Sequence, residues 1–172
     1  NEELKNLEWA AGNYNNIGII YLIQKQYPEA LKYFHEVLET YIALDDRPSQ
    51  NHPFNNIGNV YFELGKYSEA LQNYKVALEI RKEMGDLFEV SNSLINIGVC
   101  QEMLGNYDEA LNYHFESLKI ANEIDNLDGK SSIFNNIASV KVKQRKYTEA
   151  KLYYNKALLV TNEIGSKEGI MN

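Results

Sequence analysis

The stretch NIGNVYFELGKYSEALQNYKVAL, residues 56–78, decides the fold of this chain. On one side of Gly65, apolar side chains such as Ile57 and Tyr61 recur at the spacing of one helical face. The same spacing restarts at Ala70 and continues to the end of the stretch. Glycine tolerates the positive φ with which many helices end. The stretch therefore predicts two amphipathic helices joined by a tight turn at Gly65.

This two-helix pattern occurs four times, at an interval of 40 residues. Each second helix begins near a shared tetrapeptide: YPEA at 27–30, YSEA at 67–70, YDEA at 107–110 and YTEA at 147–150. Each first helix carries another: NNIG at 15–18 and 55–58, INIG at 95–98 and NNIA at 135–138. A single hairpin cannot bury its apolar face, so we expect the four copies to stack on one another as a solenoid.

Small residues recur on both predicted core faces. They are Gly18, Gly58, Gly98 and Ala138 in the first helices, and Ala30, Ala70, Ala110 and Ala150 in the second helices. We interpret them as positions where two helix backbones approach closely, so that a larger side chain would overpack the contact. At the starts of the second helices, Ser68, Asp108 and Thr148 are predicted N-caps. Pro28 suits a first helical turn.

The composition of the 172-residue chain argues against several classes of function. Its net charge of -7 is the opposite of the basic surface of a nucleic-acid-binding protein, and it also disfavours anionic membranes. No apolar run is long enough to insert into a membrane. We interpret the cations Lys141, Lys143, Arg145 and Lys146 as a solvated helix end. The single cysteine fits a reducing compartment but does not require one, so the location stays undetermined, with the cytoplasm favoured and the periplasm open.

The sequence contains no motif for catalysis or for binding a cofactor or metal. It lacks a glycine-rich phosphate loop, a nucleophile elbow and a metal-spaced pair of cysteines or histidines. His114 takes the position of Phe34 and Tyr74, so we expect it to pack in the core. Cys100 aligns with Val60 and is also expected in the core. We therefore predict that the protein is not an enzyme and has no catalytic residue, cofactor or metal site.

The run from Asn56 to Leu78 resembles the tetratricopeptide repeat, whose usual length is about 34 residues. The longer copies here, which lack the closing proline, are similar to those of spindle-orientation adaptors, kinesin light chains and the sensor regions of bacterial histidine kinases. The resemblance implies an all-α fold, a right-handed superhelical solenoid of antiparallel helix hairpins, and a role in binding proteins. Two copies depart from the pattern: Gln101 and Lys141 replace Tyr21 and Tyr61, and Arg145 replaces the turn glycine.

We expect one repeat array over residues 1–172, with repeats at about 10–46, 50–86, 90–126 and 130–166. Partial repeats flank it, because residues 1–5 align with the end of a second helix and residues 166–172 with the start of a first helix. This phase predicts a piece of a longer array. Natural fraying at the ends of a small protein would give the same pattern.

The side of each first helix that points away from its core stripe carries amides in place of the usual charges. The same position holds Asn16, Asn56, Asn96 and Asn136 in the four copies. The resemblance implies that this side lines a concave groove, where such asparagines hold the main chain of an extended peptide. An amide carries both a donor and an acceptor, so it pairs with a peptide bond whatever the side chain. Neighbours expected to tune specificity are Asn55, Asn59, Glu63, Met103, Asn135 and Ser139.

Two functions remain open from the sequence. In the first, the chain is a scaffold that binds a partner protein or peptide in the groove, as the regulatory or sensory part of a signalling protein. In the second, it is a structural or self-assembly module without a peptide ligand, and self-association uses the open ends of the stack. The asparagines would then bond across adjacent first helices and only set the superhelix.

Overall fold

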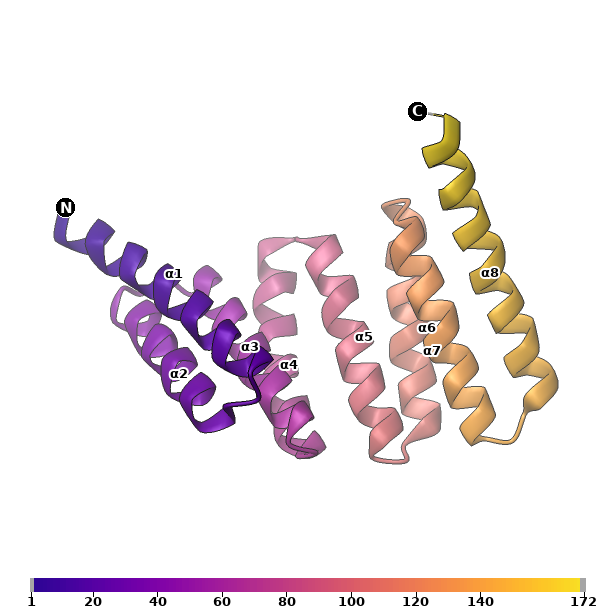
Figure 1. Cartoon of the computed structure of the whole chain (residues 1–172), viewed down its shortest axis with the longest axis horizontal. Coiled ribbons are helices and arrows are strands. Elements are labelled where there is room, and N and C mark those ends of the chain that lie inside the picture. Colours follow the sequence, from indigo (N-terminus) through magenta and orange to yellow (C-terminus); the bar gives the residue numbers. More distant parts are fainter. Residues whose placement is uncertain (1, 171–172) are drawn as a thin grey trace. The chain divides into compact units, whose positions relative to one another are not determined.

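The computed structural model describes the backbone of residues 2–170 and the side chains of residues 6–165. Within that range the chain forms eight α-helices and one short 3-10 helix. They are α1 (Glu2–Ile23), α2 (Tyr27–Ala43), η1 (Pro48–Gln50), α3 (Asn51–Glu63), α4 (Tyr67–Met84), α5 (Leu87–Met103), α6 (Tyr107–Glu123), α7 (Leu127–Lys143) and α8 (Tyr147–Ile170). Consecutive helices pair as antiparallel hairpins (Figure 1), which confirms the prediction of an all-α fold.

The hairpins divide between two compact units, one ending at Gly85 and the other beginning at Asp86. Unit 1 holds α1 to α4, and unit 2 holds α5 to α8. In each unit the first helix of the later hairpin packs against the second helix of the earlier one, α3 against α2 and α7 against α6. Each unit therefore contains one complete example of the contact between successive repeats.

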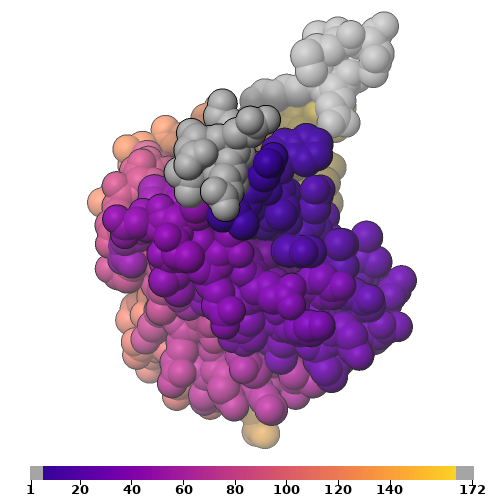
Figure 2. All heavy atoms as spheres, turned by 90° about the vertical axis from the view of Figure 1, so that its left-hand side faces the viewer, coloured from indigo at the N-terminus to yellow at the C-terminus, as the bar shows by residue number. Residues whose placement is uncertain are grey.

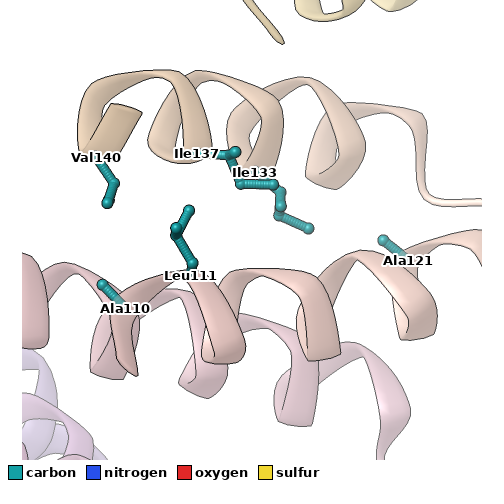
Figure 3. Packing of buried hydrophobic residues seen from close by; sticks show 6 residues of the cluster. All are labelled: Ala110, Leu111, Ala121, Ile133, Ile137 and Val140. Atoms are coloured by element: carbon teal, nitrogen blue, oxygen red, sulfur yellow. The ribbon is translucent and has the colours of Figure 1, made fainter. Parts of the chain in front are cut away.

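Figure 3 shows this contact in unit 2, where Ile133, Ile137 and Val140 of α7 point toward α6. The facing residues of α6 are Ala110, Leu111 and Ala121. The equivalent cluster in unit 1 is built from Ala30, Phe34, Ile57 and Val60. Burial of this apolar surface is the main stabilising term of each junction.

The four hairpin turns all pass through a residue with positive φ. These residues are Lys25 (59°), Gly65 (71°), Gly105 (82°) and Arg145 (61°). The prediction for the two glycines is confirmed. Lys25 and Arg145 adopt the same left-handed conformation with a side chain, which costs on the order of 1 kcal/mol at each site.

The second helices begin earlier than predicted. Helix α4 starts at Tyr67, and its N-cap, Lys66, forms no side-chain cap hydrogen bond. Ser68, Asp108 and Thr148 lie inside the first helical turn, so their prediction as N-caps is wrong. Side-chain caps occur instead on first helices of unit 2, where Asp86 accepts from the Glu89 N–H. Pro28 lies in the first turn of α2, as expected.

The glycines that recur in the first helices face aromatic rings, and not the backbone of the neighbouring helix as we expected. A Cβ atom added to Gly58 would lie 2.7 Å from ring atoms of Tyr74. The same contact joins Gly18 to Phe34 and Gly98 to His114. The small residue therefore makes room for a ring that reaches across the hairpin from the second helix.

The fourth repeat lacks this ring contact. Ala138 stands at the glycine position, and Tyr154, at the ring position, is 45% exposed, against 3% for Tyr74. In the other three repeats, a Cβ atom added to the glycine would collide with the ring. The methyl group of Ala138 is such a Cβ atom, so it occupies the space that a closely packed ring would need.

The two end helices extend into the segments expected to form partial repeats. Helix α1 runs unbroken from Glu2, and α8 continues unbroken to Ile170. No turn therefore separates residues 2–5 from the first repeat, or residues 166–170 from the fourth. Residues 1, 171 and 172, which also belong to the expected partial repeats, lie outside the described residues.

Candidate functional site

The predicted site lies on the first helices, and we call it the first-helix face. In unit 1 it is the side of α1 and α3 that carries Asn16 and Asn56, and in unit 2 it is the side of α5 and α7 that carries Asn96 and Asn136. Within unit 1, α1 and α3 lie side by side, and within unit 2 so do α5 and α7. Each unit thus brings two repeat asparagines onto neighbouring helices.

In unit 1 the first-helix face contains a hydrogen bond between neighbouring repeats. The side-chain Nδ2 of Asn56 donates to Oδ1 of Asn15 across 2.8 Å, which links α3 to α1. Asn56 is half-buried, whereas Asn16 is exposed. Asn56 therefore already has a structural role, and its own carbonyl oxygen is left to accept from a ligand.

Two of the predicted specificity residues are held from the second helix of their own hairpin. Oδ1 of Asn59 accepts from the hydroxyl of Tyr74 at 2.7 Å, and Oδ1 of Asn55 accepts from Nη1 of Arg81 at 3.4 Å. These bonds fix the orientation of the two amides, so that the NH₂ group of Asn59 is the part that remains to donate.

A hollow with a volume of about 370 Å³ opens beside Asn59 in unit 1. It is lined by Leu22, Ile23, Lys25, Asn59, Phe62, Glu63 and Tyr74. The lining includes two predicted site residues, Asn59 and Glu63, together with apolar side chains from α1 and α3. The hollow thus has an apolar body with amide, ammonium and carboxylate groups around it, as side-chain pockets commonly do.

Unit 2 presents the same face with different chemistry. Asn96 and Asn136 are half-buried, and neither side chain forms a hydrogen bond within the described residues. Ser139 donates to Oε1 of Glu102 at 2.7 Å, which links α7 to α5. Met103 is 47% exposed, and Asn135 is exposed as well. Both repeat asparagines here keep a donor and an acceptor for a ligand.

One residue of this face was missed from the sequence. Trp9 is 80% exposed and lines a shallow hollow with Asn16, Gly12 and Asn13 on α1. It lies seven residues, or two helical turns, before Asn16, which is the signal that would have placed it on this face. Trp9 is the chain's only tryptophan, and exposed tryptophans are frequent anchors in protein interfaces.

The thiol of Cys100 and the imidazole of His114 are both buried, as predicted. Burial raises the pKa of Cys100 to about 12, so the thiol stays protonated and inert. Burial likewise lowers the pKa of His114 to about 4, and neither ring nitrogen has a hydrogen-bond partner. No group of three or more metal-ligating side chains gathers in the part of the chain that the structure describes.

The expected solvated cluster of cations near residue 141 is only partly solvated. Lys141 is 9% exposed, and its Nζ lies 2.8 Å from Oε2 of Glu149 in α8. This hydrogen bond lowers the pKa of Glu149. Lys143, Arg145 and Lys146 are exposed, as predicted.

Among the described residues, no helix has the length and apolar content to cross a membrane.

The model of the tetratricopeptide repeat family matches residues 9–83 and 89–163, most of the chain. Similar solved structures include aspartyl phosphate phosphatase F from Bacillus subtilis (17% identity, TM-score 0.84), whose alignment covers 92% of this chain and 42% of that one. A Rap protein complexed with Competence and Sporulation Factor has 19% identity and a TM-score of 0.79 over 94% of this chain and 44% of that one. BtubC (BKLC) from P. vanneervenii has 18% identity and a TM-score of 0.82, with coverages of 90% and 64%.

At these identities the likeness shows the fold alone. The chain spans less than two thirds of the length of each of these structures. A search of curated protein sequences found no significant match.

Proposed function

Since the chain belongs to the tetratricopeptide repeat family, whose members mediate protein–protein interactions, we propose that it binds an extended segment of a partner protein on its first-helix face. The observation that carries the proposal is the pair of half-buried amides Asn96 and Asn136, which have no hydrogen-bond partner within the described chain. A half-buried amide without a partner gains most from a ligand that supplies both a donor and an acceptor.

The main chain of an extended peptide supplies these groups at regular intervals. Each amide-to-peptide bond contributes roughly 0.5–1.5 kcal/mol, so several together give useful affinity without selecting a sequence. Selection would come from side-chain contacts, with Trp9 and the hollow beside Asn59 in unit 1 and Met103 in unit 2. That a Rap protein of similar fold was crystallised with Competence and Sporulation Factor supports a regulatory role in signalling for this chain too.

The alternative is that the asparagines only fix the spacing of neighbouring repeats. The hydrogen bond from Asn56 to Asn15 favours this role for one of the four. Replacing Asn56 by alanine is therefore expected to lower the free energy of unfolding by roughly 0.5–1.5 kcal/mol. The same change at Asn136, which has no such bond, is expected to leave the free energy of unfolding nearly unchanged.

The test uses the three asparagines without a structural bond. Peptides are first selected on the wild-type chain from a displayed library of random sequences, and the best is synthesised. Its Kd is measured by calorimetry for the wild type and for the triple variant Asn16→Ala, Asn96→Ala, Asn136→Ala. We expect at least tenfold weaker binding by the variant, which is about 1.4 kcal/mol.

The matched control carries the same three substitutions on second helices, at Asn112, Asn122 and Asn155, which are all exposed. It is expected to bind the peptide within a factor of two of the wild type. Equal Kd values for both triple variants, or a library that yields no binder, would exclude the first-helix face as the binding site.

A further inference from the structure

The hollow beside Asn59 in unit 1 has an apolar body. Leu22 and Ile23, at the end of α1, and Phe62 of α3 contribute its apolar lining. Figure 2 shows the atoms of α1 and α2, in indigo and violet, on the surface of unit 1. The volume of about 370 Å³ lies near the lower end of the range for ligand pockets, which is about 300–1,000 Å³. The hollow therefore has the size to hold one large side chain.

The exposure of Ile23 is a property of its repeat position. Ile23 is 75% exposed. Glu63 of α3 and Lys143 of α7 hold the same repeat position and are exposed too, although each of these helices packs against a preceding second helix in its own unit. The exposure of Ile23 therefore does not depend on what precedes α1. An apolar residue at this solvent-facing position, beside Leu22 and Phe62, is typical of a binding surface.

The polar part of the lining carries charges of both signs. Lys25, in the turn after α1, supplies an ammonium group, and Glu63 of α3 supplies a carboxylate. Neither side chain forms an ion pair or a hydrogen bond within the described residues. Asn59 contributes its NH₂ group, because its Oδ1 already accepts from the hydroxyl of Tyr74 at 2.7 Å. The hollow thus offers both donors and an acceptor next to its apolar body.

A tyrosine side chain matches this combination better than the other large side chains. Its ring is apolar, and its hydroxyl both donates and accepts, so it pairs with Glu63 as donor and with Asn59 or Lys25 as acceptor. A cationic tip would be attracted by Glu63 and repelled by Lys25, and an anionic tip would meet the reverse. Phenylalanine would fill the apolar part but leave these polar groups without a partner once the hollow is covered.

We propose that the hollow beside Asn59 binds one tyrosine side chain of the partner segment. This inference rests on the proposed function, because the segment has to lie on the first-helix face for its side chain to enter. Asn59 follows Asn56 by three residues, which is about 4.5 Å along the axis of α3. The hollow therefore lies one helical turn from the carbonyl oxygen of Asn56 that is left to accept from a peptide N–H. A segment bound there places a neighbouring side chain at the hollow.

The test begins with peptides selected on the wild-type chain from a displayed library of random sequences. Among binders that the triple variant Asn16→Ala, Asn96→Ala, Asn136→Ala weakens, we expect one position to be enriched in tyrosine. The best peptide is then synthesised with tyrosine, phenylalanine, leucine or arginine at that position, and each Kd is measured by calorimetry. Phenylalanine is expected to bind about tenfold more weakly than tyrosine, because the hydroxyl pairs are lost. Leucine and arginine are expected to bind more weakly than tyrosine as well.

A double-mutant cycle then assigns the tyrosine to the hollow. Ile23→Ala removes apolar lining, so it is expected to weaken the tyrosine peptide about fivefold. It should hardly affect the peptide that carries alanine in place of the tyrosine, which makes the two changes non-additive. The matched control is Ile42→Ala, because Ile42 is 56% exposed near the end of α2 and lies outside the hollow. The control is expected to leave both Kd values nearly unchanged.

The outcomes separate this inference from the proposed function. Asparagine-dependent binders that prefer leucine or arginine, or show no preference for tyrosine, would overturn the inference and leave the proposed function standing. A tyrosine preference to which Ile23→Ala and Ile42→Ala are equally indifferent would do the same, since the ring would then bind elsewhere. A library without any binder would overturn both. Circular dichroism melting curves check that the two variants remain folded, which is expected because both isoleucines are exposed.

Discussion

At the scale of single residues, the size of one side chain determines how each hairpin closes. Glycine is a poor residue for a helix interior, by about 1 kcal/mol relative to alanine. At Gly58 that cost is offset because the ring of Tyr74 occupies the space where a Cβ atom would lie. At Gly12 in α1, nothing lies within 4 Å of an added Cβ atom. Both glycines therefore lie inside helices, but only Gly58 has a neighbouring side chain in the space that a Cβ atom would occupy.

Alanine is expected to have opposite effects at these two positions. Gly58→Ala should lower the free energy of unfolding by roughly 1–3 kcal/mol, because the ring of Tyr74 has to move. Gly12→Ala should raise it by about 0.5–1 kcal/mol through helix propensity alone. Urea denaturation of both variants measures the difference. Shifts of the same sign would show that the ring contact does not determine the choice of glycine.

His114 makes the stability of unit 2 sensitive to acid. Burial lowers the pKa of its imidazole to about 4 in the folded chain, against about 6.5 in an unfolded one. The unfolded state therefore binds a proton first, and stability is lost as the pH falls from about 6.5 to about 4. The linked loss is roughly 3 kcal/mol.

The variant His114→Phe carries the residue found at this position in the first repeat and cannot take up the proton. We expect the loss of stability between pH 7 and pH 4.5, measured by urea denaturation, to be clearly smaller in this variant than in the wild type. Carboxylates titrate in both proteins, so the difference between the two slopes isolates the histidine. If stability falls with pH equally in both proteins, protonation of His114 does not destabilise the folded chain.

At the scale of elements, the helices form because apolar residues recur at the helical period and can be buried on one face. The turns between them depend instead on one residue that adopts a left-handed backbone conformation. All four hairpin turns need a left-handed residue, and two of them supply it with glycine. Arg145 supplies it at φ 61° with a long side chain that is exposed. The left-handed conformation of Arg145 therefore destabilises the folded chain locally, and the exposed side chain makes no buried contact that would offset this cost.

Arg145→Gly is expected to stabilise the turn between α7 and α8 by up to roughly 1 kcal/mol. The greater freedom of glycine in the unfolded chain offsets part of this gain. The reciprocal change Gly105→Arg, at the matching turn of the preceding hairpin, should destabilise the chain by a similar amount. Thermal unfolding followed by circular dichroism compares the two, and a lower Tm for Arg145→Gly would contradict the argument.

At the scale of the whole molecule, stability depends on how many neighbours each helix has. Within unit 2, α6 packs against both α5 and α7, whereas α8 packs against α7. Solenoids are stabilised by such nearest-neighbour contacts, so helices with fewer of them open more readily. Leu158 of α8 is accordingly 58% exposed, whereas Leu118, at the same repeat position in α6, packs against the cluster shared with α7.

Backbone amides of α8 are therefore expected to exchange with deuterium faster than those of α6 in dilute solution. Mass spectrometry after proteolysis measures this difference directly. Protection in α8 equal to that in α6 at low concentration would contradict the neighbour argument.

The sequence by itself determined the number, order and pairing of the helices. The apolar period and the repeat interval of 40 residues encode these features locally, and a hairpin needs only contacts between neighbouring helices. For the same reason the sequence predicted the burial of Cys100 and His114, which follow from their repeat positions.

Only the tertiary structure decided which partner each of these residues meets. The ring that fills the space beside Gly58 belongs to another helix, and the amide that accepts from Asn56 lies 41 residues away. The exposure of Ile20 and Leu158 likewise depends on which neighbour covers them, because the same repeat positions are packed elsewhere in the chain. Repeat periodicity fixes which side of a helix a residue occupies, whereas contacts depend on distances between helices that only packing sets.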